Sequence, residues 1–351
     1  MTNPLSRFAM PALVIVVVLA LLAPLDLSGF GIPWTGFRRY GTYLMSLWLV
    51  TAIAAMGVNL IVGYAGQETL AQAAFLGIGA YTTAILQQIG VPFFVCFAIS
   101  GVAAFIVGIM LGFPALRVQK HYLAFVTLAF TIFVWLVIRN EEWLTGGVSG
   151  IQNIRRPVLF GINLRPELNY YYFVLALTAV LTFAMWWLIK SPWGRAFTAL
   201  RENPIRAESL GIDVRTYTLL AFAIGSAYGG LAGSIYAPLV QFIDPAPFAL
   251  GPSLLYLLMV VVGGAGSLVG PFVGAGVAVL LPEWLQVATS RINDPFWSHL
   301  LSYLLVYALI VIVMMAFCPT GLVGLFHKLT TPKRRPHADD KGPVLKSGAV
   351  S

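Results

Sequence analysis

Long apolar segments without charges recur along this chain, and they constrain its fold more than any other feature. Segments such as 8–24, 41–63 and 170–189 have the roughly 20 residues that one helix needs to cross a bilayer. The 351 residues are 59% hydrophobic and only 10% charged, whereas a soluble domain carries about 25% charged residues. Strands of a membrane barrel would be shorter and would alternate in polarity. The sequence therefore predicts an all-α, polytopic integral membrane protein.

The apolar segments divide into about ten predicted spans, with eight as the main alternative number. Two of them are irregular, because 69–89 is rich in Gly and Gln and 249–263 is short. Either could be a broken or re-entrant helix, which is tolerated in a membrane where it lines protein or a wet cavity. The ten predicted ranges are 8–25, 41–63, 69–89, 91–113, 121–139, 170–189, 217–240, 249–263, 270–287 and 299–317.

The basic residues predict the orientation. If the N-terminus is cytoplasmic and the spans alternate, two thirds of the 21 Lys and Arg residues fall in the cytoplasm, as the positive-inside rule requires. Both termini are then cytoplasmic, loop 140–169 is periplasmic and loop 190–216 is cytoplasmic. We expect a single transmembrane domain over residues 1–330 and a basic, disordered tail over 331–351. The net charge of +8 is thereby explained without a nucleic-acid partner.

The cytoplasmic loop contains two helix starts. Ser191-Pro192 and Asn203-Pro204 each place a capping side chain before a Pro at the first helical position. Gly211 suits the left-handed residue that ends a helix. The loop therefore predicts two short amphipathic helices joined at a bend. Such a pair could bind a groove of another protein or lie on the bilayer surface, and its interspersed acidic residues favour the protein partner.

Catalytic and nucleotide-binding motifs are missing from the sequence. There is no Gly-x-x-x-x-Gly-Lys-Ser/Thr phosphate loop, no Gly-x-Ser-x-Gly elbow and no metalloprotease helix motif. The two cysteines, Cys96 and Cys318, are far apart in sequence and form no metal-binding spacing. We therefore expect a chain that is not an enzyme, binds no cofactor or metal, and cannot bind ATP through a phosphate loop.

Several motifs along residues 40–326 resemble the LivM-like permeases of branched-chain amino-acid ABC transporters. The segment 206–212 is similar to the coupling loop of that family. The other matching segments, in order, are 59–67 (NLIVGYAGQ), 74–81 (AFLGIGAY), 144–151 (LTGGVSGI), 261–271 (VVGGAGSLVGP) and 319–322 (PTGL). Each motif is weak alone, but their order and spacing identify the chain as a member.

The resemblance implies a membrane-spanning subunit of an ATP-driven importer in the bacterial inner membrane. It implies a second, related permease subunit, two separate ATPase subunits that use the ATP, and a periplasmic solute-binding protein. Transport would occur by alternating access, with leucine, isoleucine and valine as substrates. Urea or short amides are alternative substrates within the same machinery. An ion-coupled secondary transporter is a further alternative, although it predicts charged residues within the spans.

Two groups of candidate residues follow. The charged and terminal residues of the cytoplasmic loop are candidates for coupling to the ATPase: Arg195, Arg201, Glu202, Arg206, Glu208 and Gly211. The candidates for the pathway or its gate are Asn59, Gly63, Gly66, Gln67, Glu68, Gln72, Gly264 and Gly266. Their alternative roles are helix packing for the amides, a solvated loop position for Glu68, and tight turns or close packing for the glycines. Asp244 is expected to cap the helix that follows it.

Overall fold

The structure is a computed structural model that describes residues 40–116, 120–159, 162–289 and 309. The predicted spans 8–25 and 299–317, the tail 331–351 and both termini lie outside the described residues.

Each of the eight remaining predicted spans contains a helix. Their bounds are α2 Tyr40–Val58, α3 Gln72–Gln88, α4 Phe93–Ala115, α5 Lys120–Asn140, α7 Glu167–Lys190, α10 Val214–Val240, α11 Leu250–Gly263 and α12 Gly270–Thr289. A π-helix, η2 Asn59–Tyr64, continues α2. The helices of α2–η2, α4, α5, α7 and α10 are long and apolar enough to cross a membrane. Of the other three, α11 and the Gly270–Glu283 part of α12 are shorter apolar helices. The two segments predicted to be irregular contain α3 and α11.

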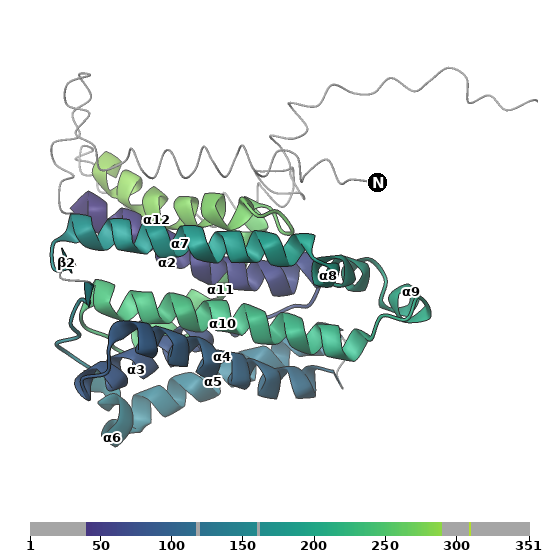
Figure 1. Cartoon of the computed structure of the whole chain (residues 1–351), viewed down its shortest axis with the longest axis horizontal. Helices are drawn as coiled ribbons and strands as arrows, with labels where there is room; N and C mark the ends of the chain where they lie inside the picture. Colours follow the sequence, from purple (N-terminus) through teal and green to yellow (C-terminus); the bar gives the residue numbers. More distant parts are fainter. Residues whose placement is uncertain (1–39, 117–119, 160–161, 290–308, 310–351) are drawn as a thin grey trace, which may run out of the picture.

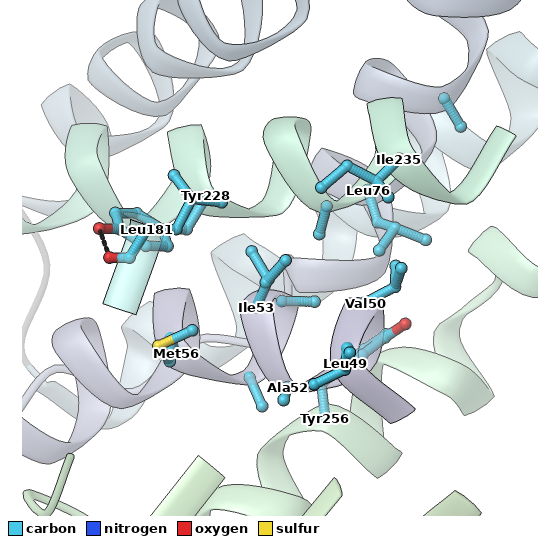
Figure 2. Packing of buried hydrophobic residues seen from close by; sticks show 14 of the residues in the cluster. Leu49, Val50, Ala52, Ile53, Met56, Leu76, Leu181, Tyr228, Ile235 and Tyr256 are labelled. Carbon is cyan, nitrogen blue, oxygen red and sulfur yellow. Dashed lines mark hydrogen bonds between the residues drawn. The ribbon is translucent and has the colours of Figure 1, made fainter. Parts of the chain in front are cut away.

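The helices α2 and α10 form the centre of the bundle (Figure 1). In each, 72% of the most apolar 18-residue stretch is buried inside the protein, compared with 28–33% of the same stretch in α4, α5 and α7. A helix that is apolar on all sides, such as α2, is stable only when other helices or lipid surround it. Figure 2 shows Val50 and Ile53 on the side of α2 toward Leu76 of α3 and Tyr228 of α10, and Leu49 beside Tyr256 of α11.

Glycines bring the backbones of α3 and α10 into contact. A Cβ atom built on Gly79 would lie 2.0 Å from the carbonyl oxygen of Gly230, and one on Gly233 would lie 2.0 Å from that of Leu76. No side chain fits such an approach. Small residues at helix contacts are the usual means of packing in a membrane, where burial of apolar surface does not drive helices together.

The outward sides of α4, α5 and α7 carry large apolar residues, which a bilayer but not water would solvate. The most exposed of these are Val102, Ile106, Met110 and Phe113 on α4, Phe125 and Phe133 on α5, and Val180, Phe183 and Trp187 on α7. This distribution confirms the predicted class of helical membrane protein.

Short elements close the bundle at the end opposite α8 and α9 (Figure 1). They are α6 Glu142–Thr145, η3 Gly147–Ser149, η4 Ala246–Phe248 and a hairpin of β1 Val158–Leu159 with β2 Ile162–Asn163. The two strands are a small departure from the predicted all-α fold. The Gly-rich segment 144–150 contains the end of α6 and all of η3. Ile151, which directly follows it, exchanges backbone hydrogen bonds of 2.9 and 3.1 Å with Ile243.

Asp244 does not cap a helix, which corrects our expectation. Helix η4 begins after Pro245 and α11 begins after Ala249, and neither start has a side-chain cap. Five residues lie between Asp244 and the start of α11 at Leu250, so the carboxylate is too far along the sequence to cap that helix.

Candidate coupling site

Two short helices, α8 Pro192–Glu202 and α9 Pro204–Ser209, occupy the loop between α7 and α10. The Ser191 hydroxyl accepts a hydrogen bond from the amide of Trp193 at 3.2 Å, and the Asn203 side chain accepts one from the amide of Arg206 at 3.1 Å. Each proline takes the first helical position, where its missing N–H costs nothing. The prediction of two capped helices is confirmed.

The end of α9 is fixed by Gly211. Its φ of 83° is in the left-handed region, which glycine adopts without steric cost. Ile212 and Gly211 donate hydrogen bonds to the carbonyls of Ala207 and Glu208 at 3.1 and 2.9 Å, which is the Schellman pattern of a helix C-terminus. This predicted turn is also confirmed.

Asp213 starts α10, and the sequence interpretation missed this role. Its carboxylate accepts hydrogen bonds from the Thr216 hydroxyl at 2.5 Å and from the amides of Arg215 and Thr216 at 3.0 and 3.3 Å. The hydroxyl contact, followed by the amide contacts, lowers the pKa of Asp213 below its ordinary value. The available signal was an acidic residue one turn before the apolar run that begins near Tyr217.

The α8–α9 pair has one side packed on the bundle and one side open. Phe197 and Leu200 are fully buried, and the Phe197 ring meets Tyr217 of α10 edge to face at 6.1 Å. Ile205 and Leu210 are instead 77% and 80% exposed. The candidate coupling residues Arg195, Arg201, Glu202, Arg206 and Glu208 are exposed as well. Charged residues around two protruding apolar side chains form a surface suited to a protein partner.

Arg201 differs from the other charged residues of the pair. Its Nη1 donates a hydrogen bond to the carbonyl of Gly63 in η2. A Cβ atom on Gly266 would lie 2.5 Å from the same nitrogen, and one on Gly66 would lie 3.0 Å from the Arg201 Cα. The side chain therefore contacts the end of η2 and the loop between α11 and α12.

Asn59 connects the same two segments. Its amide nitrogen donates to the carbonyl of Ser267 and its amide oxygen accepts from the backbone N–H of Gly266, both at 2.8 Å. The side chain is 3% exposed. Water therefore cannot bond its polar atoms, and loss of either protein partner would leave a buried polar atom unpaired. Asn59 is the first residue of the π-helix, an element that is rare and often marks functional sites.

The glycine-containing segments 63–66 and 264–266 meet around Arg201 and Asn59. We call this cluster of Asn59, Gly63, Gly66, Arg201, Gly264 and Gly266 the glycine junction. Gly66, Gly264 and Gly266 have φ values of 67°, 113° and 82°, so the turn interpretation holds for them. Gly63 is helical and serves close packing instead, because a Cβ there would lie 2.2 Å from the Asn59 oxygen and 2.4 Å from the Gly266 nitrogen.

The other pathway candidates lie outside the junction. Glu68 is exposed, and Gln67 is buried. Gln72 lies between α2 and α10, where its amide nitrogen donates to the carbonyl of Ala54 at 2.7 Å. Its amide oxygen is buried without a partner among the described residues. The Gln72 hydrogen bond joins the start of α3 to α2 and is therefore a contact between packed helices.

Residues 65–71 form a non-helical break between η2 and α3, as the prediction of an irregular third span allows. The break is satisfied by hydroxyl groups: the Thr127 oxygen accepts from the amide of Leu70 at 3.0 Å, and Thr131 and Ser253 donate to the Leu70 carbonyl. Irregular backbone is stable inside a membrane only when its polar groups are paired in this way. None of these three hydroxyl residues was predicted from the sequence to have a role.

No group of three His, Cys, Asp or Glu side chains that could hold a metal ion occurs in the part of the chain that the structure describes. The bundle of long apolar helices, with an amphipathic helix pair at one end, defines a multi-pass membrane protein.

The chain belongs to the family described as "Branched-chain amino acid transport system / permease component", whose model matches residues 41–314. It is 33% identical to the high-affinity branched-chain amino acid transport system permease protein LivM of Escherichia coli K12, and 31% identical to that of Salmonella typhimurium. Both alignments cover 91% of this chain and 78% of the relative. The autoinducer 2 import system permease protein LsrC of Yersinia pestis is 24% identical, over 83% of this chain and 80% of the relative. No solved structure matches the chain.

Proposed function

We propose that this protein is the membrane-spanning permease subunit of an ATP-driven importer of branched-chain amino acids in the bacterial inner membrane. The relatives with the higher identity are permeases for these amino acids, which favours leucine, isoleucine and valine over the autoinducer carried by the more distant relative. The permease binds no cofactor, and ATP is bound and hydrolysed by separate subunits.

The α8–α9 pair is the observation that carries the ATP-driven part of this proposal. Ile205 and Leu210 are exposed at an end of the bundle where charged residues gather. Such side chains are stabilised by insertion into a groove of another protein. We assign the ATPase subunits to this surface, which places α8 and α9 in the cytoplasm. A second permease subunit completes the pathway, and a periplasmic solute-binding protein docks at the end that carries α6 and the hairpin.

Transport in cells tests the proposal. Deletion of the gene should abolish ATP-dependent uptake of labelled leucine, and the wild-type gene should restore it. Labelled urea, measured in the same cells, should enter at an unchanged rate. Cells depleted of ATP that keep a proton gradient should take up no leucine through this protein. If gene-dependent uptake continues without ATP, the protein is an ion-coupled transporter, and if only urea uptake is lost, the substrate assignment is wrong.

A further inference from the structure

Arg201 is exposed beside the other charged residues of α8, yet its guanidinium also donates a hydrogen bond to the backbone of η2. We propose that Arg201 is a positioning residue that transmits movement of α8 to the glycine junction, and through it to α2, α11 and α12. This inference rests on the proposed function, because it names the residue through which the coupling surface acts on the pathway.

The first step is the attachment of α8 to Arg201. The helix has 11 residues and is roughly 16 Å long, with Arg201 in its last turn, two residues before the bend at Asn203. Trp193 at one end of α8 is 47% exposed, and Ile205 just beyond the bend is 77% exposed. A force applied by a partner to these exposed side chains moves the helix as one unit, and Arg201 moves with it.

The second step is the contact with the glycine turn that follows η2. Because the Arg201 Cα lies 3.0 Å from the position of a Cβ on Gly66, the backbone of this turn packs directly on α8. The Arg201 guanidinium bonds the carbonyl of Gly63 in the same segment. Movement of α8 therefore displaces the end of η2, which continues the central helix α2.

The third step crosses from η2 to the α11–α12 loop. Asn59 bonds both the amide of Gly266 and the carbonyl of Ser267, and the Arg201 guanidinium packs against Gly266. The loop is short and tightly closed, since the Ser267 hydroxyl donates to Gly264 and accepts from the amide of Gly270, both at 2.9 Å. A displacement at Gly266 is thus passed to the ends of α11 and α12.

Arginine is the side chain that this position requires. Its planar guanidinium presents several N–H donors in a fixed arrangement and can bond a carbonyl while packing flat against backbone, whereas lysine offers a single flexible ammonium. Lysine would keep the charge and the length of the stem. We therefore expect Arg201→Lys to restore only part of what Arg201→Ala removes.

The test uses vesicles that contain the complete transporter, with ATP on the α8–α9 side and labelled leucine with the solute-binding protein on the other. Two rates are measured: leucine entering and phosphate released. Arg201→Ala should lower the leucine transported per phosphate by about tenfold, the size expected for one lost charged hydrogen bond. Arg215→Ala is the matched control, because Arg215 is exposed at the same end and its side chain makes no hydrogen bond to another described residue.

The ratio of leucine transported to phosphate released separates a coupling role of Arg201 from a structural one. A smaller folded fraction lowers both rates and leaves this ratio unchanged. Asn59→Leu should lower the ratio as well, and the double variant should be no worse than the more affected single variant, because residues on one path are not additive. If Arg201→Ala does not assemble, Arg201→Lys is compared with Arg215→Ala in its place. An unchanged ratio in the Arg201 variant, or independent effects of Arg201 and Asn59, would overturn the inference. Failure of the wild-type complex to transport leucine would instead count against the proposed function.

Discussion

Replacing Ile205 and Leu210 together by aspartate should release the ATPase subunits and abolish transport. The two side chains are 77% and 80% exposed in the permease alone, and burying them in a partner would contribute about 3–6 kcal/mol. Losing that contribution weakens association at least about a hundredfold. The measurement is recovery of the ATPase subunits on a tagged permease, together with leucine uptake.

The matched control for this pair is Ile89→Asp. Ile89 is 74% exposed but follows α3, away from α8 and α9, so this variant should retain its ATPase subunits. Equal recovery of the ATPase with the Ile205/Leu210 double variant and with wild type would show that another surface binds the ATPase.

Gly79→Leu should prevent folding of the bundle. The added Cβ would lie 2.0 Å from the carbonyl oxygen of Gly230 and 2.6 Å from two other backbone atoms of that residue. Backbone cannot move aside as a flexible side chain can, so α3 and α10 must separate, at a cost of about 3 kcal/mol or more. We expect little monodisperse protein in detergent, measured by size-exclusion chromatography.

Gly251→Leu is the control for this steric argument. Gly251 is also helical, and nothing lies within 4 Å of a Cβ built on it. This variant should be recovered at the wild-type level. A monodisperse, transport-active Gly79→Leu protein would mean that α3 and α10 do not pack backbone to backbone as described.

Local signals explain what the sequence predicted well. Apolar runs located the eight helices that lie in predicted spans, because the requirement for about 20 apolar residues acts on each segment by itself. The α8–α9 pair was equally predictable, since Ser191, Asn203 and their following prolines define helix starts without reference to the rest of the fold. Gly211 belongs to the same group, because a left-handed C-terminal turn is a local requirement.

Contacts between distant segments explain what the sequence did not predict. Arg201 has the same local pattern as Arg195 and Arg206, and only the approach of Gly63 and Gly266 distinguishes it. Thr127 and Ser253 pair with the broken span through contacts 57 and 183 residues apart in sequence. Asp244 was misassigned because an acidic residue before Pro resembles a cap, although the next long helix begins six residues later.

Leucine transport by the purified complex in sealed vesicles tests the proposed function most directly. The complex holds this chain, its partner permease and the ATPase subunits, with the solute-binding protein and labelled leucine on one side. We expect leucine to accumulate only when ATP is present on the opposite side, and the Ile205/Leu210 double variant to accumulate none. Accumulation driven by a proton or sodium gradient without ATP would contradict the proposed function.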